Sequence, residues 1–216
     1  MTATARERVH AMEALAAIIA HELRAGVMGV TSAAQLLRYS VPSDPVAEKS
    51  LGRILHEAER LSALHEALTE YATELPARLV GGDPDAVWAQ VLRSMRGAIE
   101  ATGVLVTHSS ASRGSVRLDG DQLARSFERA LHHALGRVQA GTVVDIVSSV
   151  DDNTWTSTIS SREASALARA EFQRPSFLFV LAQRAIVAHG GEVIDHPSSD
   201  GPLLLSIRLP LSLHAE

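Results

Sequence analysis

The apolar positions of residues 9–75 recur at alternating steps of three and four, in two series separated by a proline-containing break at residues 41–45. The first series consists of Val9, Met12, Ala16, Ile19, Leu23, Gly26, Val30, Ala33 and Leu37. The second consists of Ala47, Leu51, Ile54, Ala58, Leu61, His65, Leu68, Ala72 and Leu75. This spacing is typical of the seam along which helices pack in a bundle. We therefore expect residues 1–76 to form an antiparallel hairpin of two long helices.

A helical hairpin on its own buries only one side of each helix. Two hairpins that pair about a two-fold axis close a four-helix bundle, which buries both seams. We therefore expect the chain to form a homodimer through this hairpin.

After residue 76 the pattern changes to short β-like runs separated by helical segments. The expected strands are residues 77–83, 104–108, 115–118, 142–150, 153–160, 191–195 and 203–209, and the expected helices are 84–102, 121–138 and 176–189. Helices on one face of a mixed sheet make an α/β sandwich. The predicted fold class is therefore α+β, with a helical domain at residues 1–76 and an α/β domain at residues 77–216.

The composition excludes several classes of function. The chain has no cysteine, which excludes disulfides and thiolate metal sites. Its only lysine is Lys49, which argues against a phosphate-binding loop that needs a lysine. The net charge of −5 is dispersed and forms no basic stripe, and no apolar run approaches the ~18 residues of a membrane span. We expect a cytoplasmic protein that binds neither nucleic acid nor a membrane.

The first helix carries the candidate chemistry at His21. This residue lies two positions after the seam residue Ile19, so its ring should point away from the bundle axis, and an exposed imidazole is a nucleophile at neutral pH. Glu22 can hydrogen-bond one ring nitrogen and leave the other free to attack phosphorus. Arg24, about one turn further on, can attract a phosphoryl group.

Other readings of the histidines stay open. An exposed His-Glu pair on a helix is most often an ordinary solvated pair. His65 falls on the second seam and is expected to be a packed or interface residue. His132 and His133 are adjacent, and neighbouring helical residues point about 100° apart, so they are poor co-ligands and no metal site is predicted.

Three segments resemble those of one protein family. Residues 20–24, Ala-His-Glu-Leu-Arg, resemble the phosphoacceptor motif of the sensor histidine kinases. Residues 185–193 resemble the family's helix that ends in His-Gly-Gly, and residues 205–210 its terminal strand. The resemblance implies that His21 is phosphorylated beside Glu22 as its acid–base neighbour. It also implies that a four-helix dimer docks a response-regulator receiver domain.

The resemblance would also imply an ATP site, but three of its motifs are altered. The asparagines that would hold Mg²⁺ align with Arg129 and His133, whereas Mg²⁺ prefers oxygen ligands. The Asp-x-Gly-x-Gly segment aligns with residues 161–165, which contain no glycine. The Gly-x-Gly segment aligns with Ser176 and Leu178, whose side chains obstruct a phosphate cradle. We therefore expect little or no ATP binding and no intrinsic cofactor.

The leading hypothesis is a histidine-containing phosphotransferase in a two-component phosphorelay. It would carry a phosphoryl group on His21 to or from a receiver aspartate, with Mg²⁺ supplied at the partner receiver domain. One alternative is an active histidine kinase with a divergent nucleotide site. Another is a non-enzymatic pseudokinase scaffold that binds a receiver domain or a kinase.

Overall fold

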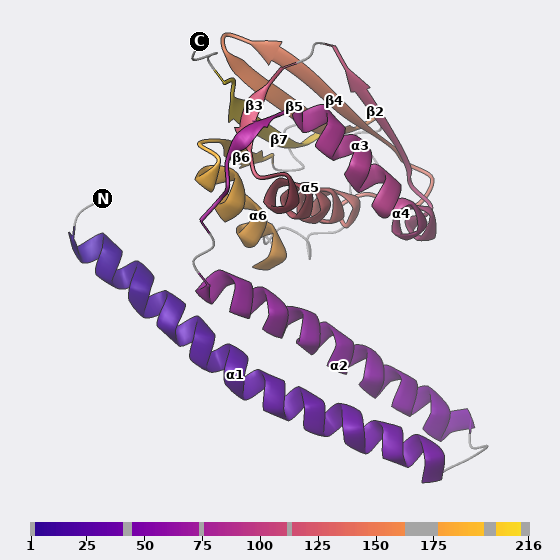
Figure 1. The fold of residues 1–216 in the computed structure, drawn as a ribbon. Coiled ribbons are helices and arrows are strands. Elements are labelled where there is room, and N and C mark those ends of the chain that lie inside the picture. The colour runs from indigo at the N-terminus through magenta and orange to yellow at the C-terminus, as the bar shows by residue number, and fades with distance from the viewer. Residues whose placement is uncertain are drawn as a thin grey trace. The chain divides into compact units, whose positions relative to one another are not determined.

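The computed structural model describes residues 3–40, 45–73, 76–111, 114–162, 177–196 and 202–212. The side chains of residues 3–15, Glu22 and Arg60 lie outside that description. The chain divides into two compact units, Met1–Leu75 and Pro76–Glu216 (Figure 1). The first unit is helical and the second combines helices with β-sheet, so the predicted α+β fold class is confirmed.

The first unit is a hairpin of two long antiparallel helices, α1 (Ala3–Ser40) and α2 (Pro45–Ala72) (Figure 1). Pro45 occupies the first position of α2, where its missing N–H has no partner to lose. The residues buried between the helices are mainly small: Ala16, Ala20, Val27, Ala34, Leu51, Ala58 and Ala67. Alanines at the contact allow the two backbones to approach closely and keep helix propensity high.

Several larger apolar residues of the predicted seam lie outside this contact. Ile19, Val30, Ile54 and Leu61 are 42%, 50%, 42% and 41% exposed, respectively. The seam series therefore spans two neighbouring faces of the hairpin. The alanine-rich face packs within the chain, and the face with the larger side chains is left uncovered.

The second unit contains a five-stranded sheet in the order β2-β4-β5-β7-β6. Its strands are β2 (Leu105–Ser110), β4 (Val143–Asp151), β5 (Thr154–Ser161), β6 (Glu192–Asp195) and β7 (Leu203–Pro210). β2 and β4 are parallel, and the other pairs are antiparallel. A separate two-stranded sheet pairs β1 (Val80–Gly82) with β3 (Val116–Leu118).

The turn between β4 and β5 lies one residue later than the sequence predicts. Asp152 and Asn153, with φ values of 42° and 66°, form it. Asp and Asn are the non-glycine residues that best tolerate positive φ, which a two-residue hairpin turn requires. The two strands predicted at residues 142–150 and 153–160 are confirmed, each with a shift of one residue, and they pair as a hairpin.

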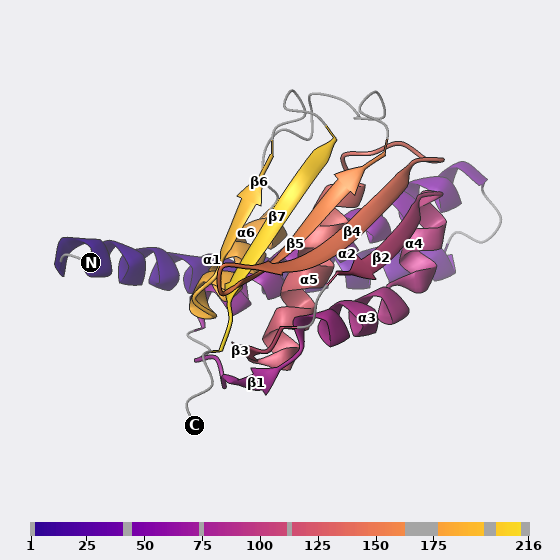
Figure 2. The ribbon, with the colours of Figure 1, turned by 90° about the horizontal axis from the view of Figure 1, so that it is seen from above.

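The helices of this unit gather on one face of the five-stranded sheet (Figure 2). They are α3 (Pro84–Ser94), α4 (Arg96–Thr102), α5 (Gly120–Leu135) and α6 (Phe177–Ala188). The single helix predicted over residues 84–102 is wrong, because the chain forms two helices that are separated at Met95 (φ −86°, ψ 0°). The side chain of Met95 is buried in the core, only 5% exposed, at the junction between the two.

A stack of three aromatic rings organises the core between α3, α5 and β5. The ring centroid of Phe127 lies 4.3 Å from that of Trp88 and 5.9 Å from that of Trp155, and all three side chains are fully buried. Both indoles have hydrogen-bond acceptors. Trp88 Nε1 donates to Ser157 Oγ (3.0 Å), and Trp155 Nε1 donates to Asp85 Oδ2 (3.3 Å). The hydrogen bonds of the two indoles therefore fix the orientation of the two tryptophan rings in the stack.

Asp85 supports this core through a buried carboxylate. It is 9% exposed, and its Oδ2 accepts hydrogen bonds from Trp155 Nε1 and Ser110 Oγ, the latter at 2.8 Å. We predict that Asp85→Ala lowers the free energy of unfolding by about 1–3 kcal/mol, because the indole N–H of Trp155 stays buried without this acceptor. Urea denaturation followed by circular dichroism measures the change.

Asp121→Ala provides a matched control. Asp85 and Asp121 both lie in the first turn of a helix, α3 and α5 respectively, but Asp121 is exposed. The two substitutions remove the same favourable interaction with the helix dipole. Equal destabilisation by both substitutions would contradict a core role for the Asp85 carboxylate.

Candidate functional site

His21 lies in the middle of α1 with its side chain exposed to solvent. Arg24, about one turn further along the helix, is also exposed, so a group that approaches the imidazole meets a positive charge beside it. Glu22 belongs to α1, but its side chain lies outside the described residues. The structure therefore brings His21 and Arg24 to one accessible surface. The role of Glu22 stays a prediction.

An apolar strip surrounds His21 on the same side of α1. Ile18 and Met28 are 62% and 61% exposed, and with Ala25 they follow the spacing of three and four residues that lines up one helical face. Exposed apolar residues that cluster around a polar centre are characteristic of a protein-docking surface. The imidazole is thus presented within a surface that a folded protein can cover.

His65 is half-buried on α2, as its place in the predicted seam indicates. Its Nδ1 lies 2.8 Å from the backbone carbonyl oxygen of Ala20, the residue that precedes His21. The sequence pattern placed His65 in the seam but gave no sign of this hydrogen bond, because it depends on the stagger of the two helices.

A groove of about 460 Å³ runs along the uncovered apolar face of the hairpin. Its lining comes from both helices and comprises Ile18, Ile19, Leu23, Gly26, Val27, Val30 and Leu61. These residues include Ile19, Val30 and Leu61 of the predicted seam. The lining has no charged side chain, so it suits apolar side chains rather than a polar small molecule.

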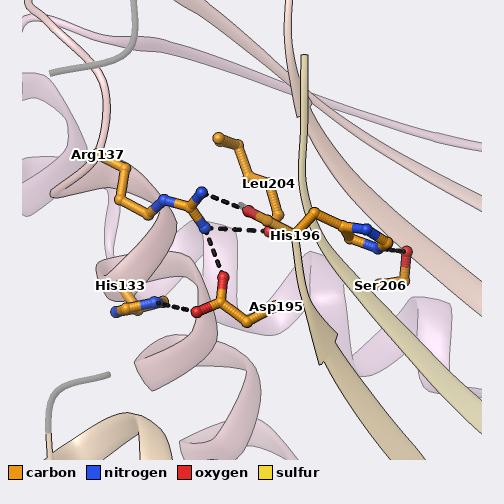
Figure 3. Close-up of polar contacts among 6 residues, drawn as sticks. All are labelled: His133, Arg137, Asp195, His196, Leu204 and Ser206. Atoms are coloured by element: carbon orange, nitrogen blue, oxygen red, sulfur yellow. Dashed lines mark hydrogen bonds and ion pairs between the residues drawn. The ribbon is translucent and has the colours of Figure 1, made fainter. Parts of the chain in front are cut away.

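In the second unit, the position predicted to replace a metal-binding asparagine is buried. The side chain of His133 is 6% exposed, and its ring stacks on Phe179 with the centroids 4.2 Å apart. His133 Nε2 lies 3.4 Å from Asp195 Oδ2 (Figure 3). Arg129, the other such position, is half-buried on the same helix. His133 thus packs against α6 and β6.

The segment aligned with Gly-x-Gly lies mostly at the start of α6. This helix begins at Phe177, and Leu178 is half-buried in its first turn. Ser176 lies outside the described residues, as do residues 163–165 of the altered Asp-x-Gly-x-Gly segment. Phe177 is the first described residue of this segment, and it already belongs to α6.

A buried arginine extends the contact of His133 into a network that joins α5 to β6 and β7 (Figure 3). Arg137 is 6% exposed. Its guanidinium donates to Asp195 Oδ1 (2.5 Å) and to the backbone oxygens of Leu204 (3.2 Å) and His196 (2.5 Å). Sequence reasoning missed this network, although an arginine at the end of an apolar helix and an aspartate at the end of a strand were both visible.

The network also sets the acidity of Asp195. Burial alone raises the pKa of its carboxyl, but the hydrogen bond from His133 and the positive charge of Arg137 outweigh that effect. The pKa of Asp195 is therefore lowered in the folded protein.

The histidine of the His-Gly-Gly segment has a packing role in this chain. His189 is 4% exposed. Its Nε2 accepts a hydrogen bond from the backbone N–H of Asp119, with the two nitrogens 3.0 Å apart. Its Nδ1 donates to the carbonyl of Ala185 at 2.7 Å. Asp119 in turn caps α5 by accepting the backbone N–H of Gln122, and this bond lowers the pKa of its carboxyl. His189 therefore connects the end of α6 to the start of α5.

The two glycines of that segment are required by geometry. Gly190 has φ of 74°, which favours glycine at the end of a helix. A Cβ atom on Gly191 would lie 2.3 Å from the carbonyl oxygen of Arg208, so no side chain fits there without moving β6 away from β7. The segment is thus explained by the turn that leads from α6 into β6.

Comparison with known proteins relates the chain to one family. Residues 11–74 match the His Kinase A (phospho-acceptor) domain family. The fold of the Acinetobacter baumannii histidine kinase AdeS matches 89% of this chain and 98% of that chain, with a TM-score of 0.62 and 20% identity. No curated protein sequence matches significantly.

Two further solved structures share the fold. The histidine kinase ThkA, solved in complex with the response regulator protein TrrA, matches over 98% of this chain and 65% of that chain, with a TM-score of 0.69 and 14% identity. Full-length ShkA, solved in complex with AMPPNP, matches over 91% of this chain and 45% of that chain, with a TM-score of 0.66 and 15% identity. The chain therefore spans less than half of ShkA.

The described residues contain no cluster of three or more His, Asp or Glu side chains arranged to hold a metal ion. None of the helices they form is both long enough and apolar enough to cross a membrane.

The lowered pKa of Asp195 gives a testable dependence on pH. Because the folded pKa lies below the unfolded value of about 3.9, the carboxylate contributes stability above that pH and loses it as pH falls through the folded pKa. We predict that Asp195→Asn is destabilising at pH 7 and that its difference from wild type shrinks below about pH 4. Urea denaturation at pH 7, 5, 4 and 3 measures both proteins, and a difference that stays constant down to pH 3 would contradict the assignment.

Proposed function

We propose that the chain, whose residues 11–74 match the His Kinase A (phospho-acceptor) domain family, acts in two-component signalling as a histidine phosphotransferase. In this proposal His21 carries a phosphoryl group to or from the aspartate of a response-regulator receiver domain. The observation that carries the proposal is the exposure of His21 within an apolar strip on α1.

The proposed transfer needs only an accessible nucleophile and a docked partner. A ring nitrogen of His21 attacks the phosphorus of the receiver's aspartyl phosphate, so a P–N bond forms as the P–O bond breaks, and the aspartate leaves as a carboxylate. Arg24 offsets the negative charge of the incoming phosphoryl group. Mg²⁺ bound to the receiver neutralises the same charge from the partner's side.

The strip around His21 supports docking of a receiver domain. Ile18 and Met28 flank the imidazole, so a folded partner that covers them also brings its aspartate near the ring. ThkA, which shares the fold, was solved in complex with a response regulator. The likeness between this chain and ThkA extends to the fold, and the pairing with a receiver is carried over as part of the proposal.

We further propose that the chain transfers phosphoryl groups without its own ATP. The fold is compatible with nucleotide, since ShkA was solved with AMPPNP, so the argument rests on the residues at the matching positions. His133 is stacked on Phe179 and directed at Asp195, and it offers no oxygen ligand for Mg²⁺. Leu178, half-buried in the first turn of α6, carries a side chain where the resemblance implies a glycine. These residues do not fit a triphosphate with its metal ion.

The hairpin is also proposed to dimerise. Its uncovered face includes Ile19, Val30 and Leu61, and they line a continuous apolar groove. A second copy of the same hairpin presents the same face, so a two-fold pair buries both grooves and closes a four-helix bundle.

Phosphotransfer is tested with purified receiver domains labelled with ³²P on aspartate. We predict that label moves to the wild-type chain, that the bond is stable to alkali and labile to acid, and that His21→Gln abolishes the label. His56→Gln is the matched control, because His56 is another exposed histidine of the hairpin and should leave transfer unchanged.

Incubation with γ-labelled ATP alone separates the alternatives. No labelling from ATP is expected. Labelling of His21 from ATP alone would favour an active kinase with a divergent nucleotide site. Absence of label from every receiver, together with stable receiver binding by His21→Gln, would favour a scaffold.

Dimerisation is tested by placing a charge in the groove. We predict that Leu61→Glu shifts the protein from dimer to monomer in sedimentation-velocity experiments, because two carboxylates would be buried at the two-fold interface. Ala63→Glu is the control: it adds the same charge to α2 at an exposed position outside the groove lining. If Leu61→Glu and Ala63→Glu have the same monomer–dimer distribution, the dimer contact does not involve the groove.

A further inference from the structure

The hydrogen bond between His65 and Ala20 joins α2 to the turn of α1 that carries the phosphoacceptor. The two residues are 45 positions apart in sequence, and the 2.8 Å separation of Nδ1 and the carbonyl oxygen is that of an ordinary N–H···O hydrogen bond. Ala20 is 3% exposed, so the bond is shielded from competition by water.

The acceptor fixes the tautomer of the His65 ring. A backbone carbonyl can only accept a hydrogen bond, so Nδ1 must carry the proton and donate it. In the neutral ring Nε2 then carries none. The donor at Nδ1 is present in both the neutral and the protonated ring.

The bond acts on the peptide group next to the phosphoacceptor. The carbonyl of Ala20 and the amide nitrogen of His21 belong to the same planar peptide unit. Holding that carbonyl from α2 therefore restricts the orientation of the backbone to which the His21 side chain is attached. The ring of His21 stays exposed, while the peptide group that precedes its Cα is hydrogen-bonded by α2.

The next part of α1 is buried against the hairpin at Val27 and contains two glycines that face open space. Gly26 and Gly29 follow within three turns, and a Cβ atom on either would meet no neighbour within 4 Å. Glycine inside a helix costs about 1 kcal/mol relative to alanine, so this segment resists bending less than an alanine helix would. The contact at Ala20 lies on the N-terminal side of this weaker segment, directly before His21.

We propose that His65 is a positioning residue for phosphotransfer: its Nδ1–H holds the Ala20 carbonyl and thereby fixes the direction in which His21 meets the partner's phosphoryl group. The inference rests on the proposed function of His21. Transfer in line requires accurate placement of the nucleophile, and a displacement of about 1 Å is enough to slow a reaction about 100-fold. His65 itself neither receives phosphate nor touches the partner.

Two substitutions separate positioning from packing. His65→Leu keeps a branched apolar side chain of similar bulk but removes the donor. His65→Asn places an amide N–H at about the position of Nδ1. We expect His65→Leu to lower the single-turnover rate of transfer onto His21 about 10-fold or more, with the receiver concentration at half-saturation unchanged. His65→Asn should restore the rate to within about 3-fold of wild type, and His56→Leu, at an exposed position of α2, should not change it.

The outcomes distinguish this inference from the function it rests on. Equal rates in wild type and His65→Leu, or equal losses in the Leu and Asn variants, would overturn a positioning role. Nitrogen-15 NMR of the full chain tests the same contact without a partner, and it should show His65 protonated at Nδ1, with His21 amide and ring resonances that move in His65→Leu and return in His65→Asn. If no receiver labels the wild type, the proposed function fails, and the NMR result still decides whether the contact orients His21.

Discussion

The close contact between α1 and α2 determines what the hairpin shows to its surroundings. Because this contact is built mainly from alanines such as Ala16, Ala20 and Ala58, it consumes little of the apolar surface of either helix. The larger side chains Ile19 and Leu61 are left on a neighbouring face, and His21 on another. One hairpin can therefore offer a surface for a second copy and a surface for a partner while its alanines form the internal contact, with Val27 belonging both to that contact and to the groove.

In the second unit, several buried polar side chains are paired with one another or with backbone groups. His133 stacks on Phe179, and Arg137 joins Asp195 of β6 to the backbone oxygen of Leu204 in β7. A buried arginine with its charge partner and carbonyl acceptors is satisfied without any bound molecule. The unit can thus keep its architecture through internal contacts.

Much of this structure could be predicted from sequence because it depends on local periodicity. The spacing of Leu51 and Ala58 is enough to predict α2, and the glycines at 190 and 191 are enough to end α6. The ion network was not predictable in the same way. Arg137 and Asp195 are 58 residues apart, and they meet because the strand order β5-β7-β6 brings β6 to α5, which no periodicity encodes. Likewise the seam pattern could place His65 between the helices, but only their stagger selects Ala20 as its acceptor.

The packing around Gly191 bears on how sequence motifs are interpreted. The backbone oxygen of Arg208 occupies the space that any β-carbon at this position would need, so every replacement, alanine included, forces the last two strands apart. The contacts of His189, Gly190 and Gly191 are then sufficient to explain His-Gly-Gly by packing, whether or not a protein still transfers phosphoryl groups from ATP. In divergent members of such a lineage, this tripeptide reports that the domain is folded, and evidence of catalytic competence must come from other positions.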